Sequence, residues 1–342
     1  MNTRRDFLKQ TGAAGASLGL AAVATAADAA TGAHGPSYKG KHTMPHNLKL
    51  LSIKHPDGSE SLGAITAGGV IEVRATAQKL GVHAPLTLDD LLQGGNADGL
   101  ARVVAGAAHS GVPLLAEADV VHGRLFAKPG KIICVGLNYR QHAKEIGMPE
   151  PRVPPLFSKY NNALAGHGAV IALPPKEVSF KFDYETELLV VMGKTCRNVA
   201  ESEALEYVAG YCTSNDFSAR DLQLELPAAQ WMIGKTLDNF APIGPYFVSA
   251  DLVGNPNALK LETYVNGELR QSSNTSDFIF NTQQIIAYIS KHWALEPGDI
   301  IFTGTPQGVI AGKPKDQQVW LKAGDEVVSS IEKLGELKFT LA

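Results

Sequence analysis

Short apolar runs separated by glycine-containing turns recur along the chain from about residue 48 onward and predict a strand-rich fold. The strands predicted in the second half lie at 188–192, 207–212, 300–303 and 326–328. The first two runs are almost wholly apolar, which is typical of strands buried deep in a core. Glu-Pro-Gly-Asp and Ala-Gly-Asp turns precede the last two. This spacing, with few long helical patterns, favours rolled β-sheets.

The segment 47–127 predicts a small N-terminal α+β domain. Apolar residues at 48–53 and 70–73 indicate short strands, separated by Asp-Gly and Gly-Gly turns. Thr87 is placed to cap a helix, and 99–109 indicates a second one. Because no constellation of chemically active residues lies here, we expect this domain to serve packing or assembly.

Residues 128–342 form the predicted larger domain, which begins at a Lys-Pro-Gly turn. Good helix formers at 218–224 predict a helix. A second helix is predicted over 281–292, capped by Thr282 and carrying a stripe of isoleucines. The fold class expected is therefore β-rich α+β, with two domains.

The first thirty residues indicate export rather than fold. Arg4 and Arg5 precede a weakly hydrophobic stretch rich in glycine and alanine, as in twin-arginine signal peptides. That stretch is too short and too weakly apolar for a stable membrane span. Residues 1–30 are predicted to direct the folded protein to the periplasm, and 31–46 to form a linker. The alternative is an unprocessed tail on a cytosolic enzyme.

Composition excludes several function classes. Of the 342 residues, 44% are hydrophobic and 19% are charged, and the formal net charge is −3. The chain has no basic run, which argues against a nucleic-acid partner. It also lacks a phosphate-binding Walker loop, a dinucleotide-binding glycine motif and a serine-hydrolase elbow. The three cysteines lie in or beside apolar stretches, which predicts small buried side chains: Cys134, Cys196 and Cys212.

The most informative polar residues stand beside the predicted core strands. Glu185 and Glu187 precede the run at 188–192, and side chains two apart on a strand share a face. Asp216 follows the run at 207–212. Neighbouring buried carboxylates repel one another unless a cation lies between them, and oxygen ligands suit Mg²⁺ or Mn²⁺. An exposed strand edge with solvated acids is the alternative.

A histidine and a glutamate stand three residues apart at His142 and Glu145. On a helix this spacing places both on one face, where the carboxylate can orient the imidazole. A histidine held in this way can act as a general base. The alternative is an incidental pair on an exposed helix.

Further polar residues fit an anion-binding pocket. Lys235 lies among apolar residues, so it either reaches solvent or stays charged beside the acidic cluster. Arg220 and Gln223 follow Asp216 by four and seven residues, which on a helix is one face. Because arginine can grip a carboxylate through two nitrogen atoms, this pair is a candidate for substrate binding. Lys159 is a further candidate for the same pocket.

Four motifs together resemble the fumarylacetoacetate hydrolase superfamily. They are GLNYRQHAKE at 136–145, DYETEL at 183–188, SNDFSARDLQ at 214–223 and GKTLDNFAPIGP at 234–245. The resemblance covers about 130–342. It implies a catalytic domain built as a mixed β-sandwich roll, generally assembled as a homodimer, and small 2-oxo acids as substrates.

The resemblance also implies roles for individual residues. His142 and Glu145 would lie on a lid over the substrate, and Lys235 would stabilise a developing enolate or oxyanion. The hydroxyl of Thr305 and nearby amides would contact the substrate carboxylate. Eukaryotic members carry an aspartate where this chain has Val135. That difference favours a bacterial subgroup of acylpyruvate and 2-oxo acid hydrolases with three metal-binding carboxylates.

The function expected is hydrolysis of a carbon–carbon bond in a small 2-oxo or 1,3-dicarbonyl acid, such as an acylpyruvate or a fumarylacetoacetate-like compound, with Mg²⁺ or Mn²⁺. A lyase, decarboxylase, hydratase or isomerase of a related acid, of the ureidoglycolate lyase or oxaloacetate decarboxylase type, remains the alternative. An exported binding protein for such acids is a third possibility, although a pure binder needs no general base.

Overall fold

The computed structural model describes residues 43–225 and 231–342. The predicted signal peptide at 1–30 lies outside the described residues, as does most of the predicted linker at 31–46. Within the described residues no helix has the length and apolar character needed to cross a membrane.

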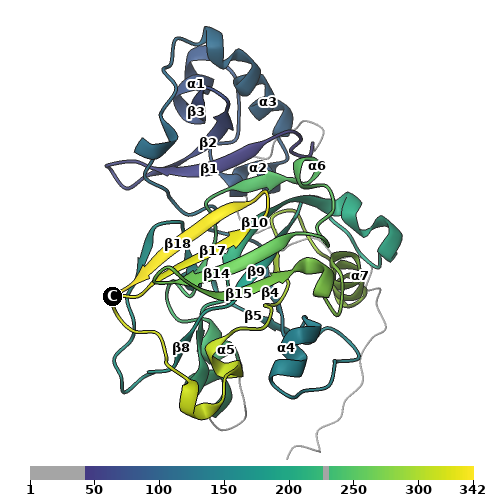
Figure 1. Ribbon diagram of the computed structural model, residues 1–342. Helices are drawn as coiled ribbons and strands as arrows, with labels where there is room; N and C mark the ends of the chain where they lie inside the picture. Colours follow the sequence, from purple (N-terminus) through teal and green to yellow (C-terminus); the bar gives the residue numbers. More distant parts are fainter. Residues whose placement is uncertain (1–42, 226–230) are drawn as a thin grey trace, which may run out of the picture. The chain divides into compact units, whose positions relative to one another are not determined.

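The larger of two main sheets runs through the centre of the described chain (Figure 1). Its strands, in order across the sheet, are β3 (Gly69–Glu72), β2 (Glu60–Thr66), β1 (Lys49–Lys54), β13 (Phe247–Ser249), β10 (Val208–Asn215), β9 (Thr186–Met192), β16 (Ile300–Phe302), β4 (Ile132–Val135) and β5 (Leu156–Ser158). Strands β9, β10, β16 and β4 are buried along their whole length. The apolar runs predicted as core strands at 188–192 and 207–212 are thus confirmed.

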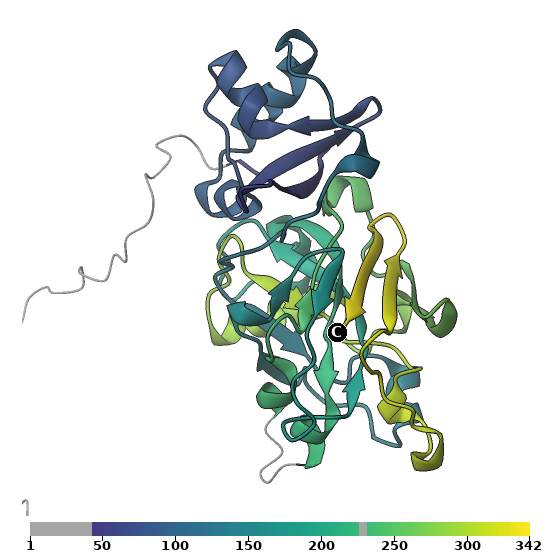
Figure 2. The ribbon, with the colours of Figure 1, turned by 90° about the vertical axis from the view of Figure 1, so that its left-hand side faces the viewer.

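A second sheet packs on the first. Its strands are β15 (Glu268–Asn274), β14 (Lys260–Val265), β17 (Glu326–Ile331), β18 (Gly335–Leu341) and β7 (Ala169–Ile171). Along β17 and β18 buried residues alternate with more exposed ones, as expected when one face is packed and the other meets solvent. The hydroxyl of Thr186 on β9 joins the sheets, because it lies within 2.5 Å of the Thr263 hydroxyl and 2.7 Å of the Ser329 hydroxyl. Figure 2 shows this packing from the side.

Helices cover the ends and faces of these sheets. They are α1 (Val73–Leu80), α2 (Leu88–Gly94), α3 (Ala97–Gly106), α4 (Arg140–Glu145), α5 (Trp231–Lys235), α6 (Ala250–Val253) and α7 (Thr282–His292). The N-cap of α2 is Thr87, as predicted. The prediction that Thr282 caps α7 is wrong by one residue. Asn281 is the N-cap, because its side chain accepts from the Gln284 amide while the Gln284 side chain accepts from the Asn281 amide.

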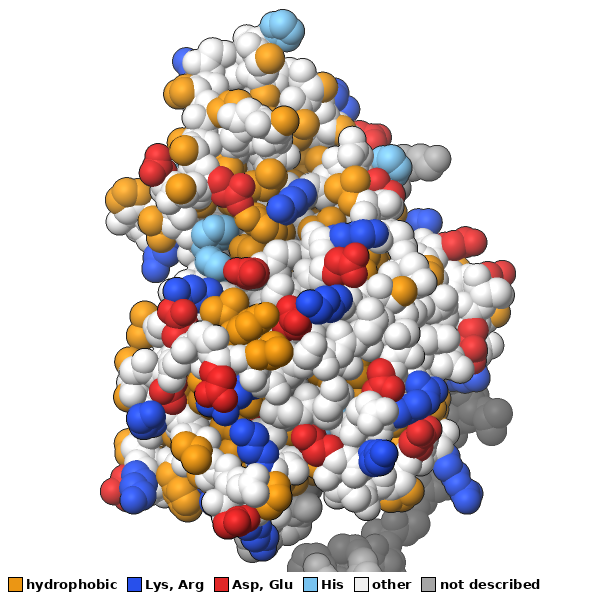
Figure 3. Space-filling view, viewed as in Figure 1, with side chains coloured by type: hydrophobic (Ala, Val, Ile, Leu, Met, Phe, Trp, Pro, Cys, Tyr) orange, Lys and Arg blue, Asp and Glu red, His pale blue; other side chains and the backbone are white. Residues whose placement is uncertain are grey.

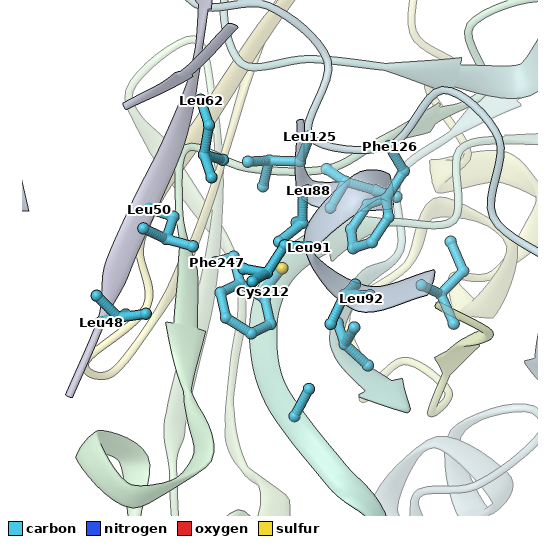
Figure 4. Close-up of a cluster of buried hydrophobic side chains, with 14 of the residues drawn as sticks. Leu48, Leu50, Leu62, Leu88, Leu91, Leu92, Leu125, Phe126, Cys212 and Phe247 are labelled. Atoms are coloured by element: carbon cyan, nitrogen blue, oxygen red, sulfur yellow. The ribbon is translucent and has the colours of Figure 1, made fainter. Parts of the chain in front are cut away.

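The N-terminal strands belong to the larger sheet. β1 pairs with β13 through Lys49 opposite Val248 and Leu50 opposite Phe247. Leucines from β1, β2 and α2 pack with Phe247 and Cys212 in one apolar cluster (Figure 4). All three cysteines are buried, as predicted. The region predicted as a separate domain therefore shares both a sheet and a core with the rest of the described chain.

The predicted helix at 218–224 is wrong over its first residues. Ser218–Ala219 forms β11, which pairs with β8 (Phe182–Asp183), and a π-helical turn follows at Asp221–Glu225. Pairing with a strand distant in sequence overrides the local helix propensity here. A second short pair, β12 (Ala241–Pro242) and β6 (Leu164–Ala165), is parallel.

On the face drawn in Figure 3, acidic and basic side chains are interspersed and hydrophobic side chains gather in small groups.

Candidate active site

Three buried carboxylates converge where β9 and β10 meet. In this antiparallel pair Glu187 lies opposite Ser214, and the amide of Asp216 donates to the carbonyl of Glu185 at 2.8 Å. One oxygen from each of Glu185, Glu187 and Asp216 lies within 4.8 Å of the others. The convergence expected from the sequence is therefore present. Glu185 stands directly before β9 rather than inside it.

Three cationic side chains surround this acidic cluster. Lys235 Nζ lies 2.5 Å from Glu185 Oε2 and 2.7 Å from Asp216 Oδ2. Lys159 Nζ lies 2.5 Å from Asp216 Oδ1 and also donates to the carbonyl of Lys235. Arg220 Nη1 lies 2.7 Å from Glu185 Oε1. All three cations are buried, so the structure brings Lys159, Lys235 and Arg220 to the place where the sequence assigned them.

The cluster contains more negative charge than these cations balance. Four buried carboxylates (Asp183, Glu185, Glu187 and Asp216) face the three cations, so with all four ionised the described residues leave one negative charge unbalanced. Among the described residues no ion pair reaches Glu187, whose Oε2 instead accepts from the amide of Gly304 at 2.7 Å.

The pKa values follow from this arrangement. Burial, then the negative charges of Asp216 and Glu185, raise the pKa of Glu187 well above its ordinary value. Burial alone would raise the pKa of Glu185 as well, but Arg220 and Lys235 outweigh it and lower that pKa. Burial opposes the charged form of Lys235, yet Asp216 and Glu185 raise its pKa. A divalent cation among the three carboxylates would offset the charge that the protein leaves unbalanced, and oxygen donors suit Mg²⁺ or Mn²⁺.

The predicted histidine–glutamate pair is present on α4. His142 Nδ1 lies 3.0 Å from Glu145 Oε2, and His142 is buried. Glu145 Oε1 accepts from the amide of Gly308 at 2.9 Å. The Glu145 carboxylate therefore fixes the imidazole on one side and is itself fixed by the backbone of a distant loop.

One loop, 303–312, links this pair to the acidic cluster. Its Gly304 amide donates to Glu187 and its Gly308 amide donates to Glu145. The hydroxyl of Tyr184 donates to the carbonyl of Gly308 at 2.8 Å. The two groups of catalytic candidates, which are distant in the sequence, thus share one backbone support.

Thr305 lies on this loop, but its hydroxyl already has partners. It donates to the carbonyl of Thr186 at 3.1 Å and accepts from Gln271 Nε2 at 3.0 Å. Its expected contact with a substrate carboxylate stays a prediction, since a substrate would compete with these bonds.

Sequence reasoning missed Gln271. This buried residue of β15 accepts from the Thr263 hydroxyl at 2.6 Å and donates to the Pro306 carbonyl at 2.9 Å. It therefore holds the 303–312 loop against the second sheet. Only the pairing of β14 with β15, which places Thr263 opposite Gln271, reveals this role.

The guanidinium of Arg220 is held by two of its three nitrogen atoms. Its Nε donates to Asp183 Oδ2 at 2.8 Å, and its Nη1 donates to Gln223 Oε1 at 2.9 Å as well as pairing with Glu185. Nη2 is buried and has no hydrogen-bond partner among the residues that the structure describes. Because an unpaired buried donor costs free energy, this nitrogen is suited to receive an acceptor such as a carboxylate. Gln223 lies beside Arg220 as predicted, because Arg220 is helical and the π-helical turn at Asp221–Glu225 follows it directly.

Gly308 offers a test of the loop's importance. Its φ is +100°, and an added Cβ would lie 2.2 Å from the carbonyl oxygen of Arg270. Gly308→Ala must therefore shift the loop, and we expect an unfolding free energy lower by about 1–3 kcal/mol and a clear loss of activity. Thermal unfolding and a turnover assay measure both. Gly324→Ala, where φ is +90° and the space is open, is the matched control and should lose stability only. An unchanged turnover rate for Gly308→Ala would show that the loop does not support the site.

Comparison with known proteins decides the family. Residues 131–342 match the fumarylacetoacetate (FAA) hydrolase C-terminal family. The chain belongs to the fumarylacetoacetate hydrolase family. This confirms the resemblance drawn from the four motifs, and the strand-rich structure agrees with solved structures of the family.

Relatives within the family catalyse different reactions. The chain is 41% identical over 292 residues to the mitochondrial oxaloacetate tautomerase FAHD2A of Bos taurus, an alignment that covers 84% of this chain and 90% of the relative. Maleylpyruvate hydrolase from Sphingobium sp. SYK-6, solved with manganese(II) and pyruvate, matches with a TM-score of 0.68 and 28% identity over 86% of this chain and 98% of that one.

A third relative is fumarylpyruvate hydrolase from Pseudomonas aeruginosa, solved with Mn²⁺ and pyruvate. It matches with a TM-score of 0.56 and 33% identity over 62% of this chain and 89% of that one. The relatives include bacterial and eukaryotic proteins, so the bacterial subgroup inferred from Val135 stays a prediction. The enzymes named are hydrolases and tautomerases, and two of them hold manganese.

Proposed function

We propose that this chain is a divalent-metal-dependent enzyme that forms the enolate of a small 2-oxo acid and cleaves a carbon–carbon bond in it by hydrolysis. The observation that carries the proposal is the shared 303–312 loop, which holds Glu187 of the acidic cluster and Glu145 of the histidine pair at one site. This arrangement combines a cation site with a general base, which enolate chemistry requires.

Glu185, Glu187 and Asp216 would hold the metal ion, Mg²⁺ or Mn²⁺. When bound there, the ion supplies Lewis-acid polarisation of the 2-oxo group and its neighbouring carboxylate. The relatives solved with manganese and pyruvate support this choice of ion and ligand class.

The protein's own side chains would do the remaining work. Arg220 would bind a substrate carboxylate through Nη2, which has no partner in the described part of the chain, and Gln223 and Lys159 would hold the pocket around it. Lys235 would stabilise negative charge that develops on the substrate oxygen. His142, oriented by Glu145, would take a proton from water, which then attacks the second carbonyl of an acylpyruvate or a fumarylacetoacetate-like acid.

Keto–enol tautomerisation of oxaloacetate is the second candidate. The 41% identity to a bovine oxaloacetate tautomerase over most of both chains favours it. The same enolate would then be protonated at a different atom, with no water consumed and no bond cleaved. Lyase and decarboxylase outcomes use the same enolate as well.

A turnover screen separates these reactions. The purified protein would be supplied with Mg²⁺ or Mn²⁺ and incubated with acylpyruvates, fumarylpyruvate and oxaloacetate, with products identified by mass spectrometry and enol content followed by ultraviolet absorbance. Two carboxylic acids from one substrate support hydrolysis, a change in enol content without new mass supports tautomerisation, and loss of CO₂ supports decarboxylation. No turnover of any 2-oxo acid with either metal would refute the enzyme proposal.

We further propose that the chain acts in the periplasm as a homodimer. The twin-arginine pattern at Arg4 and Arg5 supports the location, and the resemblance to a generally dimeric family supports the assembly.

Replacing Arg4 and Arg5 by lysine tests the export proposal. We expect the double variant to fold and remain in the cytoplasm, because the arginine pair is recognised by the export receptor. Cell fractionation with an activity assay measures the distribution. A Lys9→Arg variant, which leaves the pair intact, is the control and should be exported. Unchanged periplasmic recovery of the double variant would refute the assignment.

A further inference from the structure

Asp183 stands two residues before Glu185 and has no role in the chemistry described so far. It is fully buried, yet both of its oxygen atoms have two partners. Oδ1 accepts from the amides of Tyr184 (3.0 Å) and Ile310 (2.9 Å), and Oδ2 accepts from the amide of Ala311 (3.0 Å) and from Nε of Arg220 (2.8 Å). The carboxylate thus joins the 303–312 loop to the arginine of the site.

These bonds determine the orientation of Arg220. The guanidinium is planar, and it is held at Nε by Asp183 and at Nη1 by Glu185 and Gln223. With two of its nitrogen atoms fixed, the plane cannot rotate and the direction of Nη2 is set. Nη2 is the buried nitrogen atom that has no hydrogen-bond partner in 43–225 and 231–342. Two fixed nitrogen atoms of the guanidinium therefore set the direction of a third, Nη2, which none of the described residues engages.

We propose that Asp183 is a positioning residue. It orients Nη2 of Arg220 toward a substrate carboxylate, and by accepting from the amides of Ile310 and Ala311 it also holds the loop that supports Glu145. The inference rests on the proposed function, since it needs a carboxylate-bearing substrate. A purely structural role is the alternative, in which Asp183 only neutralises a buried arginine. The two differ in whether Asp183 affects binding through Arg220.

Asp183→Asn is the first variant. The amide has nearly the same volume, but it has one acceptor oxygen for the four donors that the carboxylate serves and no charge, so the anchor on the guanidinium is weakened. We expect the KM for oxaloacetate to rise about 10-fold or more, with a smaller change in kcat, since a charge-assisted hydrogen bond to the substrate is misdirected. Mn²⁺ affinity should stay within about 3-fold, because the three proposed ligands are intact.

Binding without chemistry gives a second measurement. Ketomalonate is a 2-oxo diacid with no hydrogen at C3, so it cannot form an enolate. In calorimetric titration of the Mn²⁺-loaded protein, Asp183→Asn should bind ketomalonate about 10-fold or more weakly. The monoamide of ketomalonate, which lacks one carboxylate charge, should show a smaller difference between the variant and the wild type.

A double-mutant cycle with Arg220→Lys shows whether Asp183 affects substrate binding through Arg220 or has a purely structural role. Lysine keeps the positive charge but has a single nitrogen atom and nothing equivalent to Nη2, so Arg220→Lys alone should weaken ketomalonate binding. If Asp183 acts through Arg220, adding Asp183→Asn in that background should weaken it by less than about 2-fold further. Full additivity of the two effects would overturn the inference.

Two further outcomes keep the inference separate from the proposed function. If Asp183→Asn does not fold, Asp183→Glu carries the same test, because it keeps the acceptor oxygens but displaces the guanidinium by one methylene group. If the wild type turns over no 2-oxo acid, the proposed function fails while the ketomalonate titration still measures the role of Asp183. If the wild type turns over oxaloacetate and both Asp183 variants keep its KM, the inference alone fails.

Discussion

Glu187→Gln is expected to abolish turnover while leaving the apoprotein at least as stable as the wild type. Glutamine keeps the shape and the acceptor oxygen for Gly304 but removes one of the charges that would hold the cation. Metal affinity should fall by at least about 100-fold. That is the upper end of the loss found when a residue that hydrogen-bonds to a metal ligand is removed, and Glu187 is itself a proposed ligand. Activity should fall at least as far, because the Lewis acid is then missing.

The stability half of this prediction follows from the pKa of Glu187. Burial and the neighbouring carboxylates raise that pKa above its unfolded value, so the charged form opposes folding at pH values above the unfolded pKa. A neutral glutamine removes this penalty at pH 7. Thermal unfolding of the metal-free variant should therefore begin no lower than that of the metal-free wild type.

Chelation provides the control. Removing divalent metal with a chelator should inactivate the wild type, and adding Mg²⁺ or Mn²⁺ should restore it but restore Glu187→Gln poorly. Glu268→Gln, on the exposed end of β15, should behave as the wild type throughout. A Glu187→Gln protein that binds Mn²⁺ and turns over substrate normally would remove Glu187 from the metal site.

The shared face of Glu185 and Glu187 could be predicted because it depends on a local pattern. The apolar run at 188–192 marks β9 in the core, and side chains two apart at a strand point the same way. Their convergence with Asp216 depends in addition on the antiparallel pairing of β9 with β10. The spacing of His142 and Glu145 likewise needs only one helical turn to bring them together. Each of these two inferences rests on the side-chain period of a strand or of a helix, which does not depend on the tertiary fold.

The parts that the sequence did not reveal depend on contacts between distant segments. Ser218–Ala219 is a strand because it pairs with β8, against its helix propensity. Asp183 and Gln271 have roles only once the 303–312 loop is folded against them. No periodicity marks such residues, since a buried polar side chain looks like any other polar residue until its partners are known.

His142→Ala is the variant that separates the two proposed reactions. If the enzyme is a hydrolase, a base must activate water, and removing it should lower kcat by about 10²–10⁴. KM should change far less, because the acidic cluster and Arg220 do not include His142. Steady-state kinetics on an acylpyruvate measure both constants, and Mn²⁺ titration checks that the metal site is intact.

Hydrogen exchange at C3 completes the test, because it reports enolate formation without bond cleavage. If His142 deprotonates only water, exchange of deuterium from D₂O into C3 of pyruvate should partly survive His142→Ala. If His142 instead removes the proton from C3, the exchange rate and the rate of oxaloacetate tautomerisation should fall together. Glu145→Gln keeps an acceptor for the imidazole but removes the charge that stabilises its protonated form, so it should have an intermediate effect on whichever reaction His142 serves. Cleavage of acylpyruvates by His142→Ala at the wild-type rate would mean that the proposed hydrolytic mechanism is wrong, and the tautomerase would become the better-supported function.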